Sequence, residues 1–285
     1  MTRTLSLAPL TVLELAPPDM VSCAAQAGYS HLGLRLLPVL PKMDVNHPII
    51  GDTPMVREVL GRLGDTGLKV LDIEFIRLTP ESRVADYAPM LETGARLGAQ
   101  HVLAGGDDPH EQRLAERFAE LCDAAAPFGL TANLEPIPLF ELRTLAQAMR
   151  VLAAADRPNS GILIDPIHFD RSGERLADAV RIPRKWLHYM QLCDASAERP
   201  ADAAGLQFQA RFDRMIPGEG GLDLPGLLRA LPREIPIALE VPMAALARTV
   251  GAAERARRLL AATLALLRRL EDEGGAAAPK FGGEP

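Results

Sequence analysis

Cysteine is scarce in this 285-residue chain, and the three present, Cys23, Cys122 and Cys193, are scattered without a CxxC pair. Such spacing provides neither a disulfide framework nor a thiolate zinc site. No apolar run approaches the roughly twenty residues that a membrane span needs. Three prolines interrupt the first twenty residues, which lack the continuous apolar core of a signal peptide. These absences predict a cytoplasmic protein with no membrane partner.

Positive charge is not in excess either. The chain has 31 Lys and Arg against 37 Asp and Glu, a formal net charge of -6, and no basic cluster stands out. This balance argues against binding the polyanionic backbone of DNA or RNA. Hydrophobic residues make up 48% and charged residues 24%, as in ordinary globular proteins that bury a core. A small molecule is therefore the expected partner, and nucleic acid is not.

Short apolar runs typical of strands alternate with longer amphipathic segments about every thirty residues, which indicates βα units. The eight expected strands are Leu5–Leu7, His31–Leu36, Lys69–Ile76, His101–Ala104, Thr131–Glu135, Gly161–Asp165, Leu187–Leu192 and Ile235–Val241. The eight expected helices are Asp19–Ala27, Pro54–Leu63, Glu81–Leu97, Pro109–Ala126, Leu142–Ala155, Arg175–Val180, Leu224–Ala230 and Ala245–Leu270.

This alternation predicts an α/β fold, a single (β/α)8 TIM barrel over residues 1–270, since one such barrel needs about 250 residues. An open Rossmann sheet would require a glycine-rich phosphate turn after the first strand, and that turn is missing. Ala195–Gly221 is a long polar connection that we expect to cover the site. Residues 271–285 are rich in Gly, Pro and charge, which predicts a flexible tail.

The active site of a (β/α)8 barrel lies at the C-terminal ends of its strands. Four late strands carry a polar residue at or near that end: Glu135, Asp165, Gln191 and Glu240. Converging carboxylates would repel one another and lose solvation unless a cation neutralised them. Oxygen ligands favour Mn²⁺ or Mg²⁺, with Co²⁺ or Zn²⁺ as further candidates. Each of the three carboxylates alone is also explained as a helix cap or an ion-pair partner, but the three together with Gln191 favour one divalent metal site.

The motifs around these residues resemble the xylose-isomerase-like TIM-barrel superfamily of sugar isomerases, epimerases and related lyases. They are LEPIP, LIDPIHFDRSG, YMQLCDA, IPGEGGLDL and ALEVP. The resemblance implies that Glu135, Asp165, Gln191 and Glu240 ligate one metal ion. It also implies that His168, three residues after Asp165, contacts the substrate or assists proton transfer. Many sugar epimerases of this kind have a histidine at the position of Gln191, whereas YMQLCDA resembles the branch that includes 3-dehydroshikimate dehydratases.

The chemistry that the resemblance implies begins with removal of a proton beside a carbonyl or hydroxyl that the metal polarises. The metal stabilises the enediolate as a Lewis acid while Glu135, Glu240 or His168 acts as acid or base. Return of the proton to the neighbouring carbon gives isomerisation, return to the other face gives epimerisation, and loss of a β-hydroxyl gives dehydration. The first hypothesis is a sugar isomerase or epimerase acting on a small polyhydroxylated carbonyl compound. The second is a dehydratase of the 3-dehydroshikimate or inosose type.

Further residues are candidates for substrate binding. Arg211 and Arg214, in the long connection, suit a carboxylate or phosphate. Arg35, Glu74 and Arg77, at the ends of the second and third strands, are weaker candidates, and the substrate would be a sugar, a cyclic polyol or a keto acid. The segment PGEG at 217–220 favours a turn over a phosphate cradle.

Two other functions fit the sequence less well. A DNA-repair nuclease resembling endonuclease IV would need additional histidine and acidic ligands and a basic surface, which the sequence lacks. A non-catalytic sugar-binding barrel conflicts with the complete ligand set. Barrels of this kind are often homo-oligomers, but no interface is evident in the sequence.

Overall fold

A computed structural model of the chain describes residues 3–39 and 44–275. Eight parallel strands form one sheet in the order β6-β5-β4-β3-β2-β1-β8-β7. They are β1 (Leu5–Leu7), β2 (His31–Arg35), β3 (Lys69–Leu78), β4 (His101–Gly106), β5 (Thr131–Glu135), β6 (Ser160–Ile162), β7 (Met190–Leu192) and β8 (Ile237–Leu239). The N–H of Gln191 donates to the carbonyl of Ile164 at 3.0 Å, which joins β7 to the end of β6 and closes the ring. The predicted (β/α)8 barrel is confirmed.

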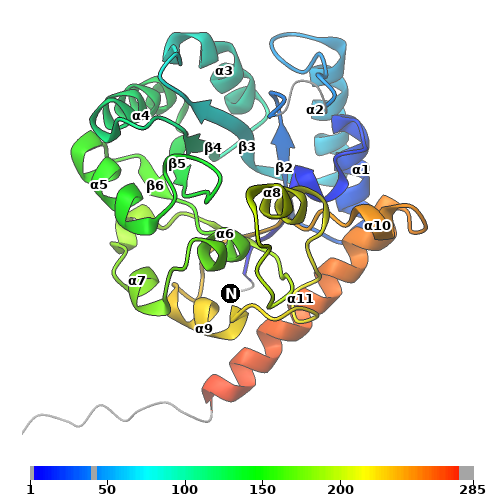
Figure 1. Cartoon of the computed structure of the whole chain (residues 1–285). Helices are drawn as coiled ribbons and strands as arrows, with labels where there is room; N and C mark the ends of the chain where they lie inside the picture. Colours follow the sequence, from blue (N-terminus) through cyan, green and yellow to red (C-terminus); the bar gives the residue numbers. More distant parts are fainter. Residues whose placement is uncertain (1–2, 40–43, 276–285) are drawn as a thin grey trace, which may run out of the picture.

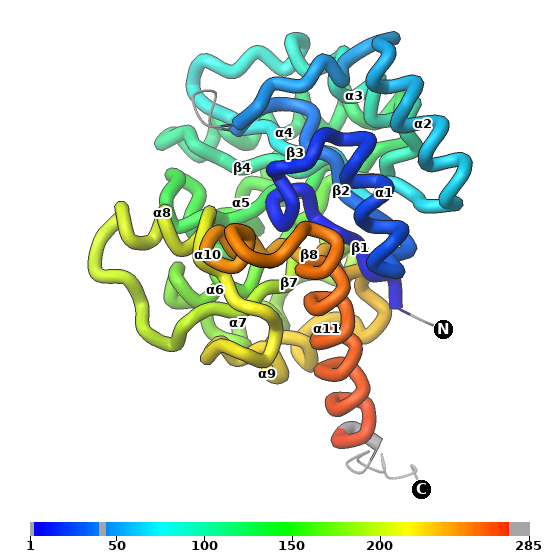
Figure 2. Tube along the Cα trace, turned by 90° about the vertical axis from the view of Figure 1, so that its right-hand side faces the viewer, coloured from blue at the N-terminus to red at the C-terminus, as the bar shows by residue number. Residues whose placement is uncertain are grey.

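Helices surround the strands (Figure 1). They are α1 (Pro17–Ala27), α2 (Pro54–Thr66), α3 (Ala88–Arg96), α4 (Glu111–Ala125), α5 (Leu145–Ala155), α6 (Pro166–Arg171), α7 (Leu176–Val180), α8 (Ala203–Phe212), α9 (Leu224–Ala230), α10 (Ala244–Ala247) and α11 (Ala252–Gly275). None of these helices, within the described residues, is long and apolar enough to cross a membrane. Figure 2 shows the last turns of α11 extending beyond the body of the barrel.

Two apolar clusters build the core. The larger one lies between the strands and the surrounding helices and includes Val70 and Ile73 of β3. The smaller one consists of Ala8, Leu71, Phe75, Leu103, Ile137, Leu163, Tyr189 and Ala238. Because strand side chains alternate between the two faces, the same strands supply the inside and the outside of the barrel.

Two predicted helices are broken in the structure. The expected helix Glu81–Leu97 is a short 3₁₀ segment, Val84–Tyr87, followed by α3. Pro89 lies at the start of α3, where its missing N–H is tolerated, and it would disrupt a longer helix passing through it. The expected helix Ala245–Leu270 is divided into α10 and α11. The second of these continues to Gly275, past residue 270, and the rest of the predicted tail, 276–285, lies outside the described residues.

Two short helices were not predicted, and both face the barrel mouth. α6 begins directly after Asp165, whose side chain accepts the N–H of Ile167, with Pro166 as its first residue. α8 begins after Asp202, which accepts the N–H of Gly205, and it occupies part of the connection 195–221. Figure 1 shows α6 and α8 in front of the ring of strands, so the long connection does cover this end of the barrel.

Candidate metal centre

Three of the predicted site residues meet at the mouth of the barrel. Glu135 is the last residue of β5, Asp165 follows β6, and His168 lies on α6. One ligand atom from each lies within 4.8 Å of the other two, and all three side chains are buried. The imidazole Nε2 of His168 is 3.8 Å from Oε1 of Glu135. His168 is placed there because the one-turn helix α6 starts at Asp165 itself.

Arg214 links two of the predicted ligands. Its Nη1 is 2.5 Å from Oδ2 of Asp165, and its Nη2 is 3.0 Å from Oε2 of Glu240, the residue that follows β8. Its Nε donates to the carbonyl of Ala210 in α8. The guanidinium is buried between two carboxylates, whereas the sequence predicted that it would bind a substrate anion.

Three buried polar atoms of the site lack hydrogen-bond partners in the part of the chain that the structure describes. They are Oε1 of Glu135 and both amide atoms of Gln191 in β7. Such atoms are costly to leave unpaired, so they indicate a ligand that the protein chain does not supply. Glu135, Asp165, Gln191 and Glu240 together offer the oxygen donors that hard divalent cations prefer. The donor set therefore fits a divalent cation.

Burial and mutual repulsion set the protonation of the site. Burial raises the pKa of Glu135 well above its usual value, and Asp165 and Glu240 raise it further. Burial also raises the pKa of Glu240, to about 7, although Arg214 opposes the shift. Burial acts in the same direction on Asp165, but Arg214 and His168 outweigh it, so the pKa of Asp165 is lowered. A cation would relieve this strain by keeping all three carboxylates ionised.

Burial favours the neutral form of His168. It lowers the pKa of the imidazole to about 4, although the Asp165 carboxylate opposes that shift. A neutral imidazole has one nitrogen that donates and one that accepts a hydrogen bond.

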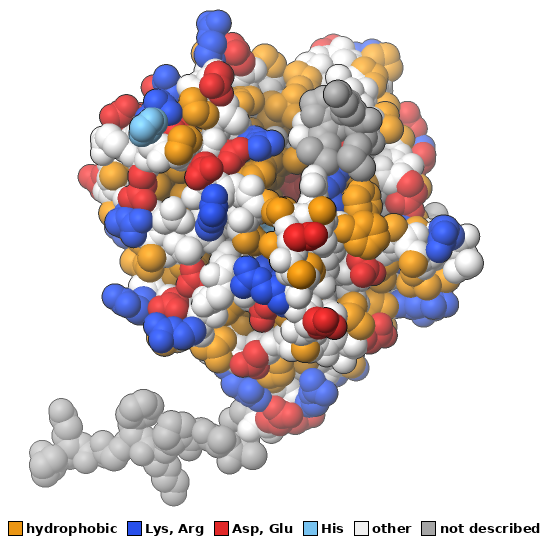
Figure 3. Space-filling model, viewed as in Figure 1, with side chains coloured by type: hydrophobic (Ala, Val, Ile, Leu, Met, Phe, Trp, Pro, Cys, Tyr) orange, Lys and Arg blue, Asp and Glu red, His pale blue; other side chains and the backbone are white. Residues whose placement is uncertain are grey.

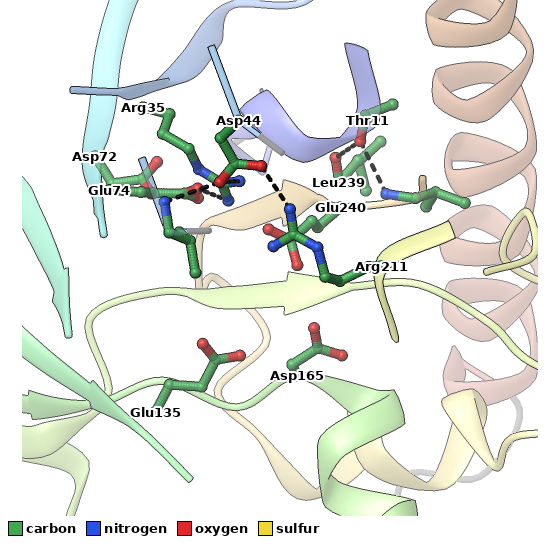
Figure 4. A network of polar contacts seen from close by, with 12 residues as sticks. Thr11, Arg35, Asp44, Asp72, Glu74, Glu135, Asp165, Arg211, Leu239 and Glu240 are labelled. Carbon is green, nitrogen blue, oxygen red and sulfur yellow. Dashed lines mark hydrogen bonds and ion pairs between the residues drawn. The ribbon is translucent and has the colours of Figure 1, made fainter. Parts of the chain in front are cut away.

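A second group of charged residues lies beside this centre (Figure 4). Arg35, at the end of β2, donates from Nη2 to Oε2 of Glu74 in β3 at 3.0 Å. Arg211, on α8, donates to Oδ1 of Asp44 at 2.6 Å, and Oδ2 of Asp44 is 4.0 Å from Nη1 of Arg35. Figure 4 shows Glu240 between this group and Asp165, so the two clusters share one mouth. Figure 3 shows a hollow near the centre of the same face.

Arg77 behaves differently from the other candidates. Its guanidinium lies 4.7 Å from the centre of the Phe140 ring and pairs with Asp107. Its side chain is 45% exposed, so it lies at the rim of the mouth.

The sequence did not single out Asp194, three residues after Gln191. Its carboxylate accepts four backbone N–H groups, from Ala195, Gly218, Gly220 and Leu222. The PGEG segment is thus a turn whose N–H groups bind an internal carboxylate. An acidic residue ahead of a glycine-rich segment was the only signal in the sequence, and it does not specify this pairing. Asp194 holds in place the connection that carries Arg214.

The match to a family model settles the classification. A model described as a xylose isomerase-like TIM barrel matches residues 22–268. The chain belongs to this family. The inosose isomerase of Bacillus subtilis (strain 168) is 26% identical over 158 residues, 52% of this chain and 55% of that protein. The 3-dehydroshikimate dehydratase of Pseudomonas aeruginosa (strain PAO1) is 30% identical over 119 residues, 40% of this chain and 18% of that protein. The matching stretch thus spans about half the length of the inosose isomerase.

Solved structures show the same fold along the whole barrel. The IOLI protein, crystallised with a binding zinc atom, has a TM-score of 0.74 and 20% identity, covering 94% of this chain and 99% of that one. A fusion of a xylose isomerase-like barrel with a 4-hydroxyphenylpyruvate dioxygenase has a TM-score of 0.79 and 20% identity. This chain is covered completely in that match, against 47% of the fusion protein.

Proposed function

We propose that the protein is a divalent-metal-dependent enzyme that removes a proton beside the carbonyl of a small polyhydroxylated compound. The observation that carries this proposal is the set of buried atoms without partners on Glu135 and Gln191, beside the paired carboxylates of Asp165 and Glu240. Mn²⁺ or Mg²⁺ suits these donors. Zn²⁺ is a further candidate, because the IOLI protein was crystallised with a zinc atom. When bound, the cation polarises a substrate carbonyl as a Lewis acid.

The protein's own groups would then handle the proton. Glu135 and Glu240 approach the mouth from β5 and β8, so their carboxylates would face a bound substrate from two sides. His168 Nε2 is 3.8 Å from Glu135 Oε1 and, being neutral, would accept or return a proton there. Arg214 would hold Asp165 and Glu240 in fixed positions, and α6 and α8 would keep water from the centre.

The reaction that we favour is isomerisation or epimerisation of a cyclic or open-chain polyhydroxylated ketone. Two carboxylates at the same centre suit removal of a proton and its return at a second position. The inosose isomerases, which match half of this chain, support this choice.

Dehydration is the second candidate. Gln191 in the segment YMQLCDA and the 30% identity with the P. aeruginosa 3-dehydroshikimate dehydratase favour it. Both reactions begin with the same proton removal.

The first experiment measures bound metal by elemental analysis in the wild type and in Glu135→Gln and Glu240→Gln. About one divalent ion per chain in the wild type, reduced in both variants, is the expected result. Glu116→Gln, at an exposed position on α4, is the matched control and should retain the metal. A wild-type protein that remains free of metal after incubation with excess Mn²⁺, Mg²⁺ or Zn²⁺ would contradict the proposal.

The second experiment separates the two reactions. The metal-loaded protein is incubated in D₂O with an inosose, with ketoses and with 3-dehydroshikimate. Deuterium in recovered substrate or product reports the shared proton removal. A new ultraviolet absorbance from an aromatic product of 3-dehydroshikimate indicates dehydration, whereas a rearranged ketone indicates isomerisation. Absence of both deuterium exchange and product formation with all of these compounds would count against the proposed substrate class.

A further inference from the structure

The pair Arg35 and Glu74 has unused hydrogen-bonding capacity at the barrel mouth. The Arg35 side chain is 9% exposed and that of Glu74 is fully buried. Among residues 3–39 and 44–275, Nε and Nη1 of Arg35 and Oε1 of Glu74 have no hydrogen-bond partner. Two donors and an acceptor buried side by side would be costly unless a ligand satisfied them.

The pair also lies close enough to the metal centre to touch the same ligand. Arg35 ends β2, Glu74 is its partner in the neighbouring strand β3, and Figure 4 shows both near Glu240. A small substrate at the centre would therefore extend toward Arg35 and Glu74.

Internal carboxylates already neutralise the two arginines of this cluster. Glu74 is 3.0 Å from Nη2 of Arg35, and Asp44 is 4.0 Å from its Nη1 and 2.6 Å from Nη2 of Arg211. A substrate carboxylate approaching a guanidinium fork of Arg35 would meet a like charge at short range, which is unfavourable. A neutral hydroxyl meets no such repulsion, and it both donates and accepts hydrogen bonds.

We infer that Arg35 and Glu74 form a subsite that binds two neighbouring hydroxyl groups of a neutral polyol ring and does not bind a carboxylate. Arg35 donates to one hydroxyl oxygen, and Glu74 Oε1 accepts from the adjacent hydroxyl. This inference rests on the proposed function, since it names the substrate class of the same site.

The test compares two ring compounds by isothermal titration calorimetry on metal-analysed protein. Myo-inositol carries neighbouring hydroxyls and no charge, and quinate carries neighbouring hydroxyls and a carboxylate. The wild type should bind myo-inositol at least as tightly as quinate. Glu74→Gln removes a charged acceptor and leaves the positive charge of Arg35 without that partner. The affinity for myo-inositol should therefore fall about tenfold, and the affinity for quinate should rise relative to that for myo-inositol. Glu116→Gln should match the wild type.

Two results would overturn the subsite. One is quinate binding more than about tenfold tighter than myo-inositol to the wild type, with that preference unchanged in Glu74→Gln. The other is failure of both compounds to bind a protein that contains its metal. Absence of metal from all preparations would instead refute the proposed function. The ratio of the affinities for myo-inositol and quinate would still show whether Arg35 and Glu74 prefer a neutral ring.

Discussion

His101 is a buried histidine whose charge is disfavoured in the folded protein. It begins β4, its ring stacks on Tyr189 at 4.8 Å between centroids and on His188 at 5.9 Å, and its Nδ1 is 2.7 Å from the hydroxyl of Thr131. Burial, and secondarily His188, lowers its pKa from 6.5 to about 3. In the unfolded chain the imidazole has its ordinary pKa, so the two states bind protons differently.

The sign of the effect follows from linkage. Because the folded-state pKa of His101 is the lower one, acid protonates the unfolded chain first and favours it. The stability is complete above about pH 6.5 and is lost as the pH falls toward 3. At pH 5, one and a half units below the unfolded value, the loss is about 2 kcal/mol. Any folded-state pKa below about 4 gives the same figure.

The assay is urea unfolding of the wild type and of His101→Phe at several pH values from 7.5 to 5. Phenylalanine retains an aromatic ring but cannot titrate. Loss of the Thr131 hydrogen bond should lower the stability of the variant by about 1 kcal/mol at every pH. On top of that constant offset, the difference between the two proteins should change by about 2 kcal/mol in favour of the variant at pH 5.

His110→Gln is the control variant for this assay. His110 is exposed, so His110→Gln should follow the wild-type curve. If the curves of the wild type and His101→Phe remain parallel down to pH 5, burial does not disfavour the charged imidazole and the reasoning fails.

Two further predictions concern the centre and the thiols. Arg214→Leu leaves Asp165 and Glu240 without their shared partner. It should destabilise metal-free protein by about 3–5 kcal/mol and Mn²⁺-saturated protein by less. An equal loss of melting temperature with and without Mn²⁺ would contradict this. Burial raises the pKa of Cys23 to about 11, that of Cys122 to about 12 and that of Cys193 well above its usual value. Iodoacetamide at pH 8 should therefore label none of them in native protein and all three in urea, as mass spectrometry can show; rapid labelling of the native chain would argue against the burial.

The alternation of apolar strands and amphipathic helices was sufficient to predict the barrel. Thr131–Glu135 was placed residue for residue as β5, since a short apolar run between a turn and a proline permits little else. The helix expected over 81–97 is interrupted before Pro89, because a proline is tolerated in the first turn of a helix and not in its interior. α6 follows Asp165 directly and α8 lies in the polar connection 195–221, so neither occupies an amphipathic segment in which the sequence predicts a helix.

Asp44 shows why part of the site was not predictable. Its partner Arg211 is 167 positions away in the sequence. Only the closing of the ring brings the segment after β2 against α8, and no local pattern records that approach. The same reason explains Asp194, whose four backbone partners include residues 24 to 28 positions later.

The sequence by itself determined the fold class and the strand ends at which polar residues emerge, because both depend on local periodicity and on the direction of parallel strands. Only the tertiary structure decided which of those residues meet. It brought Glu135, Asp165 and His168 within 4.8 Å of one another, and it placed Arg214 between two carboxylates. It also buried Arg35 and Glu74 with hydrogen-bonding groups that no other described residue pairs. These outcomes depend on distances across the barrel, which are fixed when the eighth strand pairs with the first.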